Sequence, residues 1–121
     1  MVLVDTSLWV HHLRHGLPYL QALLEKGQVV CHPFIIGELA CGNLRNRQGI
    51  LSLLEALPQA TLALHEEVLR MVDSHRLMGI GLGYIDVHLL ASALLTSTPI
   101  WSEDACLMSA ATQLGIAYLP A

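Results

Sequence analysis

Residues 1–9 read Met-Val-Leu-Val-Asp-Thr-Ser-Leu-Trp, an apolar run that stops at a carboxylate and two hydroxyls before an amphipathic stretch begins. Residues 2–4 are continuously apolar, which is typical of a buried parallel strand covered by helices on both faces. Asp5 then falls at the carboxyl end of this strand, where open α/β sheets place their ligands. Asp5, Thr6 or Ser7 could equally act only as the N-cap of the following helix. The role of Asp5 therefore depends on whether other acids converge on it.

The composition indicates one globular domain spanning residues 1–121. Because 54% of the residues are hydrophobic and only 13% are charged, the chain can build a substantial core, and a long disordered segment is not expected. No apolar run reaches the roughly 18 residues that a membrane span needs. Asp5 stands where a signal peptide would be apolar, and no basic segment precedes it. We therefore expect a cytoplasmic protein without a membrane segment.

The net charge of −4 gives the chain no general attraction to nucleic acid. A polyanionic substrate would need either a local basic patch or a bound metal to supply a positive field. Few charged residues remain to cover the surface, and such a hydrophobic excess in a small domain usually means that a partner covers part of it. We therefore expect an oligomer or a permanent complex.

Cysteine and histidine do not form a recognisable metal-ligand pattern. The three cysteines are scattered through apolar neighbourhoods, which favours buried, reduced thiols over disulfides or a zinc cluster: Cys31, Cys41 and Cys106. His11 or His12 lies three or four residues from His15, a spacing that can chelate a transition metal on a helix. Because no HExxH motif or cysteine ligand cluster accompanies them, we interpret these histidines as surface residues.

Turn residues and hydrophobic periodicity predict strands that alternate with helices. Strands are expected at residues 2–4, 28–31, 60–64, 100–101 and 116–119, and helices at residues 6–14, 19–26, 34–41, 50–57, 65–75, 85–95 and 105–114. This alternation predicts an α/β fold with right-handed crossovers, in which helices cover both faces of a mainly parallel sheet of four to five short strands. The result would be a three-layer α/β/α sandwich.

Four carboxylates occupy similar positions relative to these elements. Asp5 and Asp104 follow strands, Asp86 lies in the first turn of a helix, and Glu38 lies in a helix that follows a strand. In a parallel sheet the strand carboxyl ends and the following helix N-termini share one edge, so these acids could meet there. Glu38 stands among apolar residues, where a carboxylate is costly unless it is paired, binds a metal or lies on a thin exposed face.

Like charges that meet cannot all stay ionised without a counter-charge. Mg²⁺ and Mn²⁺ meet this need, because hard cations prefer carboxylate and water oxygens. A metal held among acids would also let an acidic protein accept a phosphodiester, activate an attacking water and stabilise the developing charge.

Four motifs in order resemble those of the PIN-domain ribonucleases. They are Val-Asp-Thr-Ser at residues 4–7, Ile-Gly-Glu-Leu at 36–39, Tyr-Ile-Asp-Val-His-Leu-Leu-Ala at 84–91 and Trp-Ser-Glu-Asp at 101–104. Each motif alone is weak, but the ordered set is specific and extends over essentially the whole chain. The short length points to the VapC-type toxins of toxin–antitoxin pairs.

This resemblance implies a PIN-like fold and an Mg²⁺- or Mn²⁺-dependent endoribonuclease that cuts structured RNA, is usually a dimer and is held inactive by a cognate antitoxin. On the family pattern, the metal is carried by Asp5, Glu38, Asp86 and Asp104, and the hydroxyls of Thr6 and Ser102 support them. Ser102 replaces a frequent threonine. Glu103 makes the fourth ligand ambiguous, but the hydroxyl-x-Asp spacing favours Asp104 and leaves Glu103 to solvent.

RNA contact would rest on the scarce arginines, with Arg14, Arg45 and Arg47 as the candidates. Two other functions remain open. One is a catalytically silent binding module with a PIN-like fold. The other is a phosphoryl-transfer α/β domain, which is disfavoured because no second aspartate follows two residues after Asp5 and no lysine lies late in the chain, Lys26 being the only one.

Overall fold

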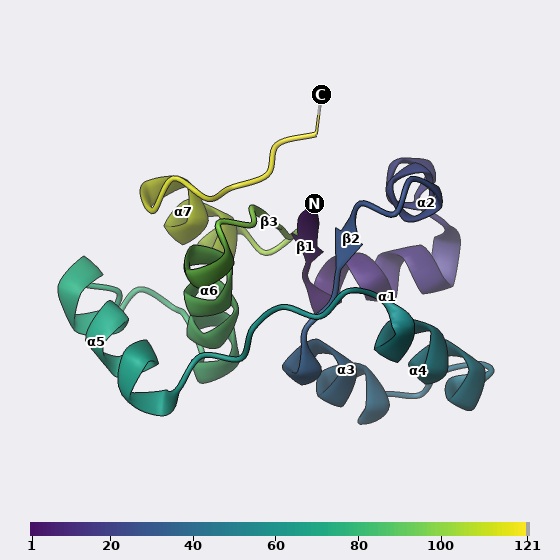
Figure 1. The fold of residues 1–121 in the computed structure, drawn as a ribbon, viewed down its shortest axis with the longest axis horizontal. Coiled ribbons are helices and arrows are strands. Elements are labelled where there is room, and N and C mark those ends of the chain that lie inside the picture. Colours follow the sequence, from purple (N-terminus) through teal and green to yellow (C-terminus); the bar gives the residue numbers. More distant parts are fainter. Residues whose placement is uncertain (121) are drawn as a thin grey trace.

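The computed structural model describes residues 1–120, so that only Ala121 of the predicted domain lies outside the described residues. Its centre is a parallel sheet of three short strands in which β1 (Val2–Val4) lies between β2 (Val29–Val30) and β3 (Ile100–Trp101) (Figure 1). Figure 1 shows α1 to α4 on one side of this sheet and α5 to α7 on the other. The predicted α/β class and parallel sheet are confirmed.

The sheet has slightly fewer strands than expected. No strand forms at residues 60–64, where a single parallel bridge joins the preceding Gln59 to Cys31, and the predicted strand at 116–119 is reduced to one parallel bridge from Ala117 to Ile100. The amide of Ala60 donates to Cys31 O at 2.7 Å, and that of Tyr118 donates to Ile100 O at 2.8 Å. Because β2 and β3 are only two residues long, they offer these flanking segments almost no edge to pair with.

Seven helices lie within residues 1–120 and match the predicted helices closely. They are α1 (Thr6–His15), α2 (Pro18–Glu25), α3 (Pro33–Ala40), α4 (Arg47–Ala56), α5 (His65–His75), α6 (Tyr84–Thr96) and α7 (Ala105–Gln113). Pro18 and Pro33 occupy the first turns of their helices, where the missing amide proton costs nothing. None of these helices is long and apolar enough to cross a membrane.

Helix α6 is the central element of the core. Its residues 87–93 are all buried, and it packs against β3 and α5. Leu89 and Leu90 are fully buried, as are Leu3 and Val4 of β1. Each such side chain contributes about 1.5–3 kcal/mol through burial. This packing holds the N-terminus of α6 next to the carboxyl ends of the strands.

The cysteines only partly follow expectation. All three are free thiols. Cys31 is fully buried, and this burial raises its pKa to about 11. Cys41 and Cys106 are exposed, so the prediction of burial was wrong for these two, because each lies at a helix end rather than on its inward face.

Candidate active site

The carboxyl edge of the sheet gathers the N-termini of four helices. Helices α1, α3 and α7 begin directly after β1, β2 and β3, and α6 runs back toward the sheet before β3. The N-terminal ends of helices carry partial positive charge and unpaired backbone amides, which stabilise nearby carboxylates. The predicted site residues Asp5, Glu38, Asp86 and Asp104 all belong to these helices or directly precede them.

Asp5 is buried, with 7% of its surface exposed. Its Oδ2 atom accepts hydrogen bonds from Ser102 Oγ at 2.6 Å and from Ser7 Oγ at 3.1 Å. Although Asp5 precedes α1, its side chain makes no capping hydrogen bond, and neither hydroxyl that follows it caps the helix. Within residues 1–120, no donor bonds to Asp5 Oδ1. The alternative that this aspartate serves only as a cap is therefore wrong.

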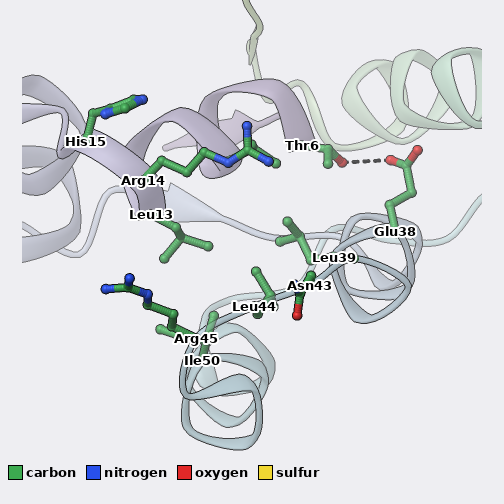
Figure 2. Close-up of a pocket in the computed structure, with 12 residues that line it drawn as sticks. Thr6, Leu13, Arg14, His15, Glu38, Leu39, Asn43, Leu44, Arg45 and Ile50 are labelled. Carbon is green, nitrogen blue, oxygen red and sulfur yellow. Dashed lines mark hydrogen bonds between the residues drawn. The ribbon is translucent and has the colours of Figure 1, made fainter.

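Glu38 is joined to the same edge through Thr6. The Thr6 hydroxyl donates to Glu38 Oε1 at 2.6 Å (Figure 2). Glu38 is exposed on α3, while Ile35 and Leu39 of the same helix face the core. Of the alternatives that the sequence left open for this carboxylate, the structure shows the exposed helix face, because the apolar neighbours in sequence point inward.

Asp86 and Asp104 are each held by a backbone amide near the start of their helices. Asp86 Oδ2 accepts from the Gly83 amide at 2.9 Å, and Asp104 Oδ1 accepts from the Leu107 amide at 3.0 Å, so Asp104 also acts as an N-cap. Burial raises the pKa of Asp86 above its usual value, and the charges of Asp5 and Asp104 raise it further, against the opposing effect of the Gly83 bond. The three aspartates are therefore close enough to interact electrostatically.

The donor types and the charge excess fit a hard divalent cation. The donors to Asp5 all contact Oδ2, and the repulsion that raises the pKa of Asp86 is what a cation would relieve. No three His, Cys, Asp or Glu side chains of the described chain converge tightly enough to form a complete metal-binding group. The four acids thus lie at one edge of the sheet, and each accepts a hydrogen bond from a different donor.

Ser7, His11 and Glu103 form contacts at this edge that the motifs do not reveal. The Glu103 amide donates to Ser7 Oγ at 3.0 Å, and the Asp104 amide donates to Ser102 Oγ at 2.9 Å. The Glu103 carboxylate contacts His11 Nδ1 at 2.9 Å, so it is exposed but not free in solvent as expected. Ser7 and His11 are four apart on one helix face, and this spacing was the available signal.

The two histidines of α1 that are spaced for a chelate with His15 each make another contact. His11 contacts Glu103, while His12 Nδ1 accepts from the Leu17 amide at 3.0 Å, and burial lowers the pKa of His12. On α6, His88 is buried and its Nε2 lies 2.9 Å from the Tyr84 hydroxyl. The same hydroxyl lies 2.7 Å from His65 Nδ1, which connects the starts of α5 and α6.

A cleft of about 720 Å³ adjoins Glu38 and Thr6 between α1, α3 and α4 (Figure 2). Its lining is mainly apolar, with two arginines and a histidine on its walls: Thr6, Val10, Leu13, Arg14, His15, Glu38, Leu39, Gly42, Asn43, Leu44, Arg45 and Ile50. Arg14 and Arg45 are exposed and form no ion pair within residues 1–120. Arg47 does not line the cleft. Its guanidinium donates to Ala40 O, at the end of α3, at 3.0 and 3.3 Å.

Comparison with known proteins identifies relatives across the whole chain. No model of a protein family matches it. Two curated proteins named ribonuclease VapC32, from two strains of Mycobacterium tuberculosis, are each 43% identical to it over 118 residues, which span 97% of this chain and 95% of the relative. With this identity over nearly the full length of both proteins, the chain belongs to the VapC family of ribonucleases, which its four acidic motifs already resemble.

Proposed function

We propose that this protein is a metal-dependent endoribonuclease, the toxin of a toxin–antitoxin pair, that hydrolyses phosphodiester bonds of structured RNA. The observation that carries the proposal is the placement of four acids at an edge where four helix N-termini meet, with Asp5 and Glu38 each held by a hydroxyl at 2.6 Å. The 43% identity to ribonuclease VapC32 supports the same activity. A protein with a net charge of −4 needs a local positive field to accept a polyanion, and a bound cation would contribute to it.

In this proposal Asp5, Glu38, Asp86 and Asp104 hold Mg²⁺ or Mn²⁺. The bound cation supplies a nucleophile at neutral pH and neutralises the charge that develops on the phosphate. Thr6 orients Glu38 through its 2.6 Å bond, and Ser102 orients Asp5 through a bond of the same length. These short bonds hold two carboxylates in place before substrate binds, which lowers the cost of organising the site.

The cleft beside Glu38 is the proposed path of the RNA. Arg14 and Arg45 stand on its walls without an intramolecular ion pair, so both guanidinium groups are available for phosphates. Arg47 is a weaker candidate, since it already donates to Ala40 O. The apolar lining between the two arginines can contact bases or ribose.

Cleavage of a structured RNA panel tests the activity directly. Purified protein free of antitoxin should cleave with Mg²⁺ or Mn²⁺, and Asp5→Asn should abolish cleavage. Asp73→Asn is the matched control, because Asp73 is an exposed aspartate on α5, a helix that carries none of the proposed site residues. Equal cleavage by Asp5→Asn, or no cleavage by the wild type across the panel, would contradict the proposal.

Calorimetric titration with Mn²⁺ separates a metal enzyme from a catalytically silent binding module. The wild type and Asp73→Asn should bind Mn²⁺ alike, and Asp86→Asn should bind it far more weakly. If Asp86→Asn binds as well as the wild type, the proposed ligand set is wrong.

A cognate antitoxin and a second copy of this chain are the proposed protein partners. Large apolar side chains remain exposed on several helices and loops, which supports a covered surface: Leu53, Leu62, Leu64, Leu69, Met78, Ile80 and Leu95. Light scattering of the purified chain should give the mass of a dimer. Co-expression with the antitoxin should suppress RNA cleavage.

A further inference from the structure

Residues 102–104, which follow β3 and carry Asp104, are tied to α1 by paired serine hydroxyls. Ser7 Oγ accepts the Glu103 amide at 3.0 Å, and Ser102 Oγ accepts the Asp104 amide at 2.9 Å. The same two hydroxyls contact Asp5 Oδ2 at 3.1 and 2.6 Å. One carboxylate oxygen is thus connected, through two hydroxyls, to two consecutive amides of the loop.

Counting protons assigns the donors in this arrangement. Each serine hydroxyl carries a single proton. Ser102 makes the shorter contact to Asp5, so it donates there. Ser7 then donates either to Asp5 Oδ2 or to Ser102 Oγ, which is 3.2 Å away. In both cases Ser7 Oγ accepts from the Glu103 amide, so α1 is bonded to the loop after β3 whichever donor assignment holds.

The serine contacts fix the orientation of the Asp5 carboxylate, as a metal ligand requires. Oδ2 is held by hydroxyl donors, whereas Oδ1 accepts no hydrogen bond from residues 1–120. One turn further along α1, His11 contacts both oxygens of Glu103, at 2.9 and 3.1 Å. This contact pairs the Glu103 carboxylate with α1, whereas the neighbouring Asp104 contributes to the raised pKa of Asp86.

We propose that Ser7 is a positioning residue of the metal site, which sets the spacing between Asp5 and Asp104 by bonding to the loop that carries Asp104. This inference rests on the proposed function, because it concerns the ligands of the proposed cation. Removing Ser7 leaves the Glu103 amide without its acceptor and lets the loop move relative to Asp5.

The first experiment measures the loop without any metal. In Ser7→Ala, the Glu103 amide should exchange with solvent about tenfold faster than in the wild type, the change expected for one lost hydrogen bond. Ser7→Thr retains the hydroxyl and should restore slow exchange. Ser109→Ala is the matched control, because Ser109 is exposed on α7 and forms no hydrogen bond through its side chain.

The second experiment measures Mn²⁺ affinity by calorimetry and RNA cleavage kinetics in the same variants. Ser7→Ala should bind Mn²⁺ about 10- to 100-fold more weakly, the range typical of lost supporting bonds around metal ligands. Its kcat at fixed Mn²⁺ should fall while KM for RNA stays unchanged, because Ser7 lies outside the proposed RNA cleft. Ser7→Thr should recover both quantities.

The possible outcomes separate this inference from the proposed function. If Ser7→Ala keeps the wild-type Mn²⁺ affinity and kcat while its Glu103 amide exchanges faster, Ser7 only stabilises the loop and the inference is wrong. If the wild type itself neither binds Mn²⁺ nor cleaves RNA, the metal site is wrong, and the inference fails with it for a different reason.

Discussion

At the scale of single residues, the carboxyl edge holds an aspartate whose ionised form is disfavoured. Burial, and then the charges of Asp5 and Asp104, raise the pKa of Asp86 and so disfavour its ionised form. The backbone amide of Gly83 and the helix N-terminus only partly offset this cost. Such an arrangement trades stability of the metal-free protein for readiness to bind a cation, a pattern found at functional sites.

Asp86→Asn should therefore stabilise the metal-free protein at neutral pH by a few degrees in Tm. Because the folded-state pKa is raised, the repulsion is absent below pH 3.8, where the carboxyl is protonated in both the folded and unfolded states, and is complete above the raised pKa. The gain should thus vanish in acid. Thermal melts of both proteins with EDTA from pH 3.5 to 7.5 measure it. An equal Tm at pH 7 would contradict the electrostatic argument.

The buried His32 leads to a second prediction, about how stability depends on pH. It is fully buried, its Nδ1 accepts from the Phe34 amide at 3.0 Å, and its Nε2 lies 3.0 Å from Ser92 Oγ. Burial, and then the nearby His88, lower its pKa from 6.5 to about 4. Because the unfolded chain binds a proton more readily, stability should fall by about 3 kcal/mol as the pH drops from 6.5 to 4.

The variant His32→Asn separates this titration from packing. Asparagine can still cap α3, so the variant should fold, with lower stability at pH 7 but a shallower decline toward pH 4. Urea unfolding at several pH values provides the measurement. A decline as steep as that of the wild type would assign the acid sensitivity to other groups.

At the scale of elements, helix ends decide the geometry of the site. The starts of α5 and α6 are linked by the Tyr84 hydroxyl, which lies 2.7 Å from His65 and 2.9 Å from His88. His88 Nδ1 is buried without a partner in the described chain, so the Tyr84 bond is the one that satisfies this ring. Asp86 follows Tyr84 by two residues and depends on the same helix start.

Tyr84→Phe should destabilise the protein by about 1–2 kcal/mol, because it leaves a buried imidazole without its hydrogen bond. Tyr19→Phe is the matched control, since its hydroxyl bonds at 2.7 Å to Tyr118, an exposed contact whose partner can turn to water. Denaturant unfolding at pH 7.5 should show a clearly smaller loss for Tyr19→Phe. Equal losses would mean that burial of His88 does not matter.

At the scale of the whole molecule, the arginines are distributed unevenly around an acidic protein. Arg14 and Arg45 share the cleft beside Glu38, whereas Arg70 lies on α5 at the other side of the sheet (Figure 1). Attraction of RNA should therefore be local and should depend on salt, because bound arginines displace counterions from phosphates.

Arg14→Ala and Arg45→Ala should each raise KM for RNA, with kcat nearly unchanged. Each substitution should also lower the slope of log KM against log salt by about 0.7–0.9, the change expected per lost phosphate contact. Arg70→Ala should change neither quantity. Cleavage assays at several salt concentrations measure both, and an equal effect of Arg70→Ala would place the RNA elsewhere.

The local pattern of residues determined most of the fold and the candidate site. The apolar run before Asp5 predicted β1, the prolines and glycines predicted the helix ends, and four motifs predicted Asp5, Glu38, Asp86 and Asp104 as the acids of interest. These features depend on neighbours in sequence, through periodicity, turn chemistry and strand–helix alternation. The length of the outer strands was not predictable, because residues 60–64 and 116–119 needed partner edges that β2 and β3 do not provide.

Only the tertiary structure decided how the acids are held and what surrounds them. Ser102 contacts Ser7 and Asp5, which are 95 and 97 positions away in the sequence. His11 and Glu103 are 92 positions apart. The tertiary structure also decided that Arg14 and Arg45 line the cleft, whereas Arg47 donates to Ala40 O. Hydrogen bonds and electrostatic coupling depend on distances in space, which the packing of α6 and the parallel sheet sets and which no spacing along the chain encodes.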